Sequence, residues 1–188
     1  YFPLGSYVID GFSTLSSLEH LTLDILSRGR GTSYIFQGLE KLPLLRKFSL
    51  KITFIKENEW PLLEQFLKSQ NKLQTLKLNL SSGPSAKDRY LHQNYHLENI
   101  IKDLDNKPLL KTLQFRSAFW TLETLSKGFA HLQMTNQLES FKFGVSDETI
   151  ISEQKPWKRA EGLCNFIKNQ KGSLKNLYIH IPLVLEDN

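Results

Sequence analysis

One pattern of apolar positions recurs six times along the chain. It consists of Leu, two variable residues, Leu or Phe, one variable residue and an aliphatic or Phe residue, and another aliphatic residue usually follows two positions later. The copies begin at intervals of 27 to 37 residues, at Leu18, Leu45, Leu73, Leu110, Leu138 and Leu174. A repeat period of about 20 to 50 residues is typical of a solenoid, in which each unit packs only on its neighbours.

Each copy of the pattern predicts one strand. In the third copy, Leu76 and Leu78 alternate with Lys77 and Asn79. Alternation with a period of two is typical of a strand that is buried on one face. The pattern therefore predicts strands near residues 18–25, 45–52, 73–80, 110–117, 138–145 and 174–181.

The segments between the strands show helical spacing. After Glu57, the apolar residues Trp60, Leu63 and Phe66 lie on one helical face, and Pro61 is placed early, as in many helix starts. Similar faces consist of Ile35, Phe36, Leu39 and Leu42; of Leu97, Ile100, Ile101 and Leu104; of Leu122, Leu125, Phe129 and Leu132; and of Leu163, Cys164 and Ile167. Strands joined through helices pair in parallel, and the wider helices curve the array. We therefore predict an α/β solenoid shaped as a horseshoe, with about six parallel strands on its concave face and helices on its convex face.

The six copies resemble leucine-rich repeats, and the units of 27 to 28 residues with full helices resemble the ribonuclease-inhibitor-like class. The resemblance covers residues 17–182. In this family, Asn or Cys usually follows the third leucine and bonds to the turn backbone. The corresponding positions here hold Leu26, Thr53, Ser81, Ala118, Ser146 and Pro182. The regular asparagine ladder is thus absent, and irregular turns are expected.

Residues 1–17 fit no repeat, so we predict an irregular N-terminal segment or part of a preceding repeat, with a short strand near Tyr7 to Ile9. Residues 18–188 form the predicted repeat domain. Because the chain starts at Tyr1 and little sequence follows the last strand, we expect a segment of a larger protein. Two units are longer by eight or nine residues, and their extra loops, which start near Ser81 and Ser146, are predicted to form one insertion rim.

The composition indicates the cellular compartment in which the protein is expected. Cys164 is the only cysteine, which excludes an internal disulfide framework and favours an intracellular, cytoplasmic location. Its apolar neighbours predict that Cys164 is packed in the core. The sequence contains no apolar run of 18 residues and no signal peptide, so no membrane association is expected. A net charge of +5 permits attraction to nucleic acid but does not require it.

The alternation also identifies the strand residues that point out of the concave face. They are His20, Thr22 and Asp24; Lys47, Ser49 and Lys51; Thr75, Lys77 and Asn79; Thr112, Gln114 and Arg116; Ser140, Lys142 and Gly144; and Asn176, Tyr178 and His180. Five of them are basic and one is acidic, whereas the composition of the chain predicts about two or three basic residues. The candidate binding residues on this face are Lys47, Lys51, Lys77, Arg116, Lys142 and Tyr178. The alternative is an ordinary solvated face.

The insertion rim is a second candidate binding surface. It contains Lys87, Arg89, Tyr90, Lys155, Trp157, Lys158 and Arg159. Mixtures of cations and aromatic rings are common at protein interfaces. The alternative is that Trp157 anchors the start of a helix, in the way expected of Trp60 and Trp120.

Signals for catalysis, cofactors and metals are weak. His92 and His96 have the i, i+4 spacing of metal ligands on a helix, but no third ligand is evident. His20 and His180 lie on the first and sixth strands, about 24 Å apart at standard strand spacing. The glycine segment from Gly83 lacks the spacing of a phosphate-binding loop. We expect no catalytic residue, no cofactor and no metal site.

These observations favour a non-enzymatic interaction module or scaffold, within a large assembly, that binds a protein partner through the concave face and the insertion rim. A nucleic-acid-binding module that uses the basic face is one alternative. The 18 Lys against 6 Arg residues, and the single outward aromatic residue Tyr178, weigh against it. The resemblance to leucine-rich repeats adds a third hypothesis, the substrate-recognition arm of a ubiquitin ligase.

Overall fold

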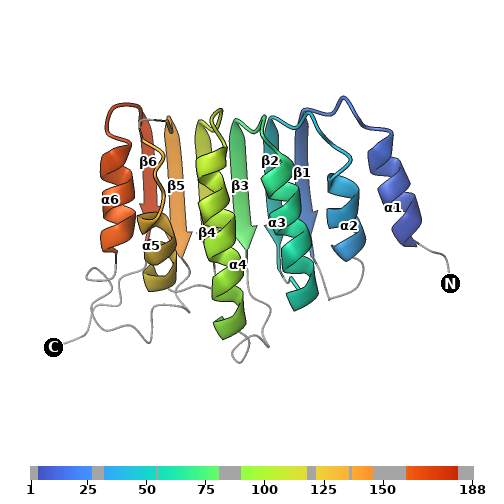
Figure 1. The fold of residues 1–188 in the computed structure, drawn as a ribbon, viewed down its shortest axis with the longest axis horizontal. Coiled ribbons are helices and arrows are strands. Elements are labelled where there is room, and N and C mark those ends of the chain that lie inside the picture. The colour runs from blue at the N-terminus through green and yellow to red at the C-terminus, as the bar shows by residue number, and fades with distance from the viewer. Residues whose placement is uncertain are drawn as a thin grey trace.

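The computed structural model describes residues 4–26, 32–53, 55–80, 90–117, 122–135, 137–145 and 160–181. Within these residues, six strands form one sheet, and the helices form a single layer on one side of it (Figure 1). The strands are β1 (His20–Ile25), β2 (Lys47–Ile52), β3 (Thr75–Leu80), β4 (Thr112–Ser117), β5 (Ser140–Val145) and β6 (Asn176–His180). The helices are α1 (Leu4–Ser13), α2 (Thr32–Leu39), α3 (Trp60–Ser69), α4 (Tyr90–Asp103), α5 (Leu122–Ala130) and α6 (Glu161–Asn169). Short 3-10 turns, η1 (Glu57–Glu59) and η2 (Leu104–Asn106), adjoin α3 and α4.

The strands follow one another in sequence order, and each pairs in parallel with the next. Every strand begins two residues after the first leucine of its repeat. The predicted strands are thus confirmed to within two residues at each end. The structure is an α/β solenoid of the leucine-rich repeat type, as the sequence predicts.

The core lies between the sheet and the helices. Along β2, the side chains of Phe48, Leu50 and Ile52 are buried, whereas Lys47 and Lys51 are exposed. The first leucine of each central repeat is also fully buried. Burying one such side chain contributes about 1.5 to 3 kcal/mol, so the repeated pattern supplies the main stabilisation of each unit.

The helices bury the predicted faces, with one correction. In α3, the buried residues include Trp60, Leu63 and Phe66. In α6, however, Cys164 is exposed, so the prediction that its thiol is packed is wrong. The core position is filled instead by Phe166, two residues further along and on the same helical face as Leu163.

The N-terminal segment also differs from the prediction. Residues 4–13 form the helix α1, which rules out an irregular segment there and is compatible with the alternative, part of a preceding repeat. Tyr7 to Ile9 lie inside this helix, so the predicted short strand is wrong. α1 lies beside α2, and Phe12 packs against the core. Its ring contacts the position of Gly38 closely: a Cβ atom there would lie 2.5 Å from Phe12 Cδ2. The three residues from Tyr7 to Ile9 favour strands by residue type, and the packing of α1 on α2 overrides this local preference.

Polar side chains at the turns between helix and strand join neighbouring repeats. Gln170 Oε1 accepts hydrogen bonds from the backbone N–H groups of Gln137 and Leu138, each at 3.0 Å, and Gln170 Nε2 donates to the carbonyl oxygen of Met134 at 2.7 Å. The Asp105 carboxylate likewise accepts the N–H of Met134 at 3.0 Å. These bonds satisfy backbone groups of the helix-to-strand turns that would otherwise be unpaired, and they join neighbouring repeats.

Lys107 is buried at one of these turns. Its Nζ donates a hydrogen bond to the carbonyl oxygen of Lys68 at 3.0 Å, near the C-terminus of α3. A cation is favourable at a helix C-terminus, where carbonyl oxygens lack intrahelical partners. Burial lowers the pKa of Lys107, and the nearby charge of Asp103 opposes that shift. Burial correspondingly raises the pKa of Asp103, against the effect of Lys107 and then of Lys68.

Candidate functional site

The strand register arranges the outward side chains of the concave face, the sheet surface opposite the helices, in three rows. The first row is His20, Lys47, Thr75, Thr112, Ser140 and Asn176; the second is Thr22, Ser49, Lys77, Gln114, Lys142 and Tyr178; the third is Asp24, Lys51, Asn79, Arg116, Gly144 and His180. All six candidate residues of this face therefore lie on one surface. They are divided among the three rows, with Lys47 in the first, Lys51 and Arg116 in the third, and the others in the second.

The basic charge of the amino-terminal half of this face, β1 to β3, is partly compensated. Lys51 Nζ lies 2.8 Å from Asp24 Oδ2 on the neighbouring strand. Both side chains are about half exposed, so the pair contributes little to stability. Its main effect is to reduce the positive potential around Lys51.

The carboxy-terminal half, β4 to β6, has no such compensation within the part of the chain that the structure describes. Arg116 and Lys142 are exposed. Along the rows, Arg116 lies between Asn79 and Gly144, and Lys142 lies between Gln114 and Tyr178, so neither has an acidic neighbour in its row. No ion pair joins either cation to a described carboxylate. The positive charge is therefore available to an external group.

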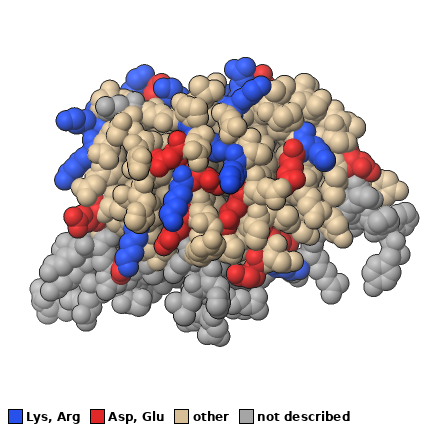
Figure 2. All heavy atoms as spheres, in the orientation of Figure 1, with Lys and Arg blue, Asp and Glu red and all other residues tan. Residues whose placement is uncertain are grey.

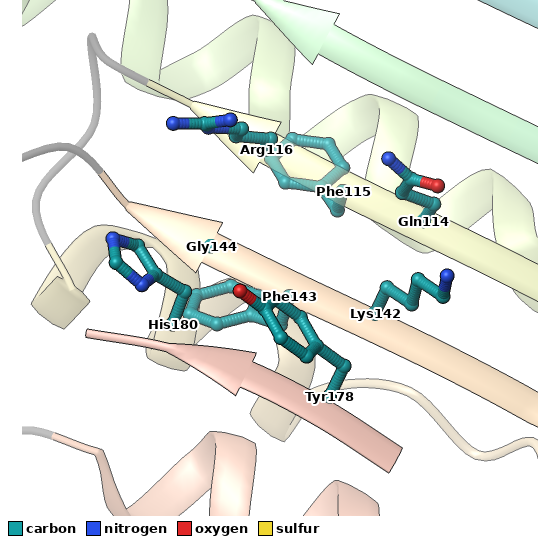
Figure 3. A pocket seen from close by; sticks show the side chains of 8 residues that line it. All are labelled: Gln114, Phe115, Arg116, Lys142, Phe143, Gly144, Tyr178 and His180. Carbon is teal, nitrogen blue, oxygen red and sulfur yellow. The ribbon is translucent and has the colours of Figure 1, made fainter. Parts of the chain in front are cut away.

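A depression of about 280 Å³ lies in this half of the face (Figure 3). One of its lining residues is Gly144, which is buried although its row faces solvent. Arg116 and His180, the register partners of Gly144, lie on either side of it. Because Gly144 has no side chain, the space between these two neighbours stays open.

The polar lining of the depression consists of hydrogen-bond donors and contains no carboxylate. Arg116, Lys142 and the amide of Gln114 donate, and Tyr178 and His180 can do so as well. Lys142 and Gln114 lie at one end, while Arg116 and His180 lie at the other (Figure 3). This chemistry suits an anionic group, above all a planar one that can accept two bonds from a guanidinium.

Sequence reasoning assigned Arg116, Lys142 and Tyr178 to a binding surface but did not assign Gln114, Gly144 or His180. From the sequence, all three are predicted only as outward positions of the concave face, and His180 lies too far from His20 to share a metal with it. The missed signal was a glycine inside a strand, which often marks the close approach of another group. Whether such a glycine opens a binding site depends on the side chains beside it on the neighbouring strands, here Arg116 and His180.

The insertion rim lies outside the described residues, except that Tyr90 is the first residue of α4. Lys87, Arg89, Lys155, Trp157, Lys158 and Arg159 are not described, nor is Trp120. The rim therefore remains a prediction from the sequence.

The helix-covered face has a different character. Acidic and basic side chains alternate over it (Figure 2). A depression of about 460 Å³ between α3 and α4 is lined by charges of both signs: Glu64, Asp103, Lys68 and Lys102. Since these charges compensate one another, this face is a weaker candidate for attracting a charged partner.

His96 belongs to a packed cluster on the helix face. Its Nδ1 lies 2.5 Å from Glu64 Oε1, its Nε2 lies 3.3 Å from Glu57 Oε1, and its ring stacks on Trp60 with centroids 5.9 Å apart. Both ring nitrogens thus face α3 and η1. In the described portion of the chain, no three His, Cys, Asp or Glu side chains form a cluster that could hold a metal.

None of the described helices is both long and apolar enough to cross a membrane.

The protein resembles known proteins in its structure, whereas the sequence comparisons give no match. No family model matches the sequence, and no curated protein matches it. Among solved structures, the C-terminal domain of tropomodulin from Caenorhabditis elegans has a TM-score of 0.52 and 12% sequence identity, over 89% of this chain and 95% of that one. A leiomodin-1 domain described as actin-binding site 2 has a TM-score of 0.56 and 9% identity, over 91% of each chain. At such identities the likeness concerns the fold, and it does not distinguish the ribonuclease-inhibitor-like class from other repeat classes.

Proposed function

We propose that the protein is a non-enzymatic interaction module that binds a protein partner through the concave face. The observation that carries this proposal is the positive surface of Arg116 and Lys142 at the depression around Gly144, with Lys77 in the same row as Lys142. Interface cores favour Arg and aromatic residues, and Tyr178 lies beside these cations with 57% of its surface exposed. A partner with an acidic surface fits this charge.

The structural neighbours support a role of this kind. One of them is described as an actin-binding site, so a related architecture can serve protein binding. We propose by extension a scaffold within a larger intracellular assembly, with Lys47, Lys51 and the insertion rim as further contacts. Actin itself is a candidate partner that a direct assay can accept or reject.

The test compares two charge-reversed variants of the full chain as baits. Lys77→Glu with Lys142→Glu alters the second row of the face, whereas Lys41→Glu with Lys72→Glu changes the same charge at exposed turns away from the face. We expect the first variant to lose specific partners, identified by mass spectrometry, and the second to retain them. Co-sedimentation with purified actin filaments forms a separate arm.

Equal capture by both variants would overturn the concave-face proposal. Thermal unfolding of each variant controls for folding, because both pairs are exposed and should change stability by less than about 1 kcal/mol. Capture of nucleic acid in place of protein, with an affinity that falls steeply as salt rises, would instead favour the alternative function.

A further inference from the structure

The depression on the concave face is a built feature of the strand register and not an incidental gap. Gly144 is placed between the strands that carry Arg116 and His180, which are about 10 Å apart across two strand spacings. A Cβ atom at Gly144 would lie 3.6 Å from Arg116 Cγ and 3.7 Å from His180 Cβ. Any larger side chain would therefore occupy the space between the two polar neighbours.

The glycine is not required by its backbone. Its φ angle lies outside the left-handed region, and a Cβ atom would make only ordinary van der Waals contacts. A β-branched residue would stabilise a strand better than glycine does. The absence of a side chain at this position thus has no local structural cause. It leaves space at the bottom of the depression in which an external group can bind.

The size of the depression restricts the ligand. Pockets for drug-sized ligands and cofactors span about 300 to 1,000 Å³, so a volume of about 280 Å³ lies at the lower end. One amino-acid side chain fits such a space better than a nucleotide does. The open concave surface allows the chain that bears this residue to continue over the neighbouring strands.

The side chains that line the depression restrict the chemistry of the ligand further. Arg116 offers a planar fork of donors, and Lys142 and Gln114 offer donors at the other end of the depression. A carboxylate accepts such a fork with two parallel bonds. Tyr178 adds an aromatic ring against which the aliphatic part of an acidic side chain can pack.

We propose that the depression at Gly144 is the anchor site for one Asp or Glu side chain of an acidic protein segment, held at one end of the depression by Arg116 with support from His180. This inference rests on the proposed protein-binding function and names the group that the concave face recognises. The site is a pocket for a single carboxylate, in contrast to a diffuse attraction of charge.

The experiment is an NMR titration of the isotope-labelled full chain with acetylated, amidated pentapeptides. One peptide has a central Glu in a Gly and Ser background, one has Gln in its place, and one has phosphoserine. We expect the Glu peptide to shift the signals of the Gly144 amide and the Arg116 side chain in a saturable manner, and the Gln peptide to bind about tenfold more weakly, because a charge-assisted hydrogen bond is lost.

Two variants make the test specific. Gly144→Val fills the depression without changing charge, and it is expected to abolish the saturable shifts while its thermal stability stays equal or rises. Ser49→Val is the control variant, since it places the same valine side chain in the second row on β2, outside the depression. Arg116→Gln is expected to weaken binding of the Glu peptide about tenfold.

Unchanged binding by Gly144→Val, equal binding of the Glu and Gln peptides, or preference for the phosphoserine peptide would each overturn the carboxylate assignment. Shifts centred on Lys47 and Lys77 in place of Gly144 would do the same. In that case the charge-reversed baits still decide whether the concave face binds a partner, so the anchor site and the proposed function can fail separately.

Discussion

The two halves of the concave face use the same strand template in different ways. In β1 to β3, the Lys51 cation is paired with Asp24, and the surface rows carry a side chain at every position. In β4 to β6, Arg116 and Lys142 lack a described carboxylate partner, and Gly144 opens a depression between strands. The repeat therefore fixes where side chains point, while single outward residues decide whether a surface is neutralised or available.

The same contrast extends into the core behind each half. Behind β4 to β6, Phe129 contacts the rings of Phe141, Phe143 and Phe166 at centroid distances of 5.1 to 5.9 Å. Behind β2 and β3 the described core residues are mainly leucine, and they include an edge-to-face pair of Phe48 and Phe66 with centroids 4.8 Å apart. This aromatic cluster packs behind the strands that carry the depression.

The largest expected effect tests this aromatic cluster. Phe129→Ala should destabilise the protein by roughly 3 to 5 kcal/mol, because it removes a fully buried ring and leaves a cavity. Urea unfolding monitored by circular dichroism measures the change. Phe66→Ala is the matched variant behind the other half, and it should cost about 1 kcal/mol less because it loses one aromatic pair and not several. Equal losses would show that the two cores are energetically alike.

A smaller effect, on peptide affinity, is expected when the paired charge is removed from the amino-terminal half of the concave face. Asp24→Asn removes the partner of Lys51 at nearly constant shape. We expect the acidic pentapeptide to bind about two- to threefold more tightly at low salt, since the potential of the whole face rises. Glu40→Gln, which removes an equal charge at an exposed turn, should have a weaker effect. If the two variants behave alike, the Lys51 pair does not limit the potential of the face.

The smallest effect concerns a pair at the starts of the last two strands. Lys175 Nζ lies 2.9 Å from Glu139 Oε2, and this hydrogen bond, followed by the charge of Lys175, lowers the pKa of Glu139. A lowered pKa in the folded state contributes stability above the unfolded value of about 4.3, and this contribution is lost as pH falls through the folded value.

Lys175→Ala should therefore be slightly less stable than the parent chain above about pH 5, and this difference should shrink below about pH 4. Thermal unfolding of both proteins, above about pH 5 and again below about pH 4, measures the difference in stability. Both side chains are well exposed, so the difference should also decrease with added salt. A gap that widens in acid would contradict the assigned role of Lys175. The corresponding pair at the first two strands, Arg46 and Glu19 at 3.4 Å, provides the comparison.

The sequence predicts the repeat architecture well because its signals are local and repeated. The leucines at strand positions alternate, and Trp60, Leu63 and Phe66 follow a helical period, so strands and helices can be assigned without any distant contact. The prediction for Cys164 is wrong because an apolar residue beside a helix's buried face can still be exposed. In α6, Phe166 fills the core position with a larger apolar side chain. The strand predicted near Tyr7 to Ile9 rests on three residues alone, whereas their helical structure depends on the contact of α1 with α2, which lies outside this segment.

The candidate site was predictable only in part. Alternation placed Arg116, Lys142 and Tyr178 on the concave face, which the register confirms. The depression was missed because it depends on which residues become neighbours across strands that are far apart in sequence. Only the register shows that Gly144 lies between Arg116 and His180. Charge pairing, such as that of Lys51 with Asp24, depends on the same information.

The bonds from Gln170 have a consequence for the motions of the chain. This side chain in the last described repeat holds the backbone N–H groups of Gln137 and Leu138, residues 33 and 32 positions earlier. In a solenoid, terminal units can open while the rest stays folded, at a cost set by their contacts with the neighbouring unit. Exchange of these two amide protons with solvent deuterium therefore requires Gln170 to withdraw. Their exchange rates report how often the final repeat separates from the one before it.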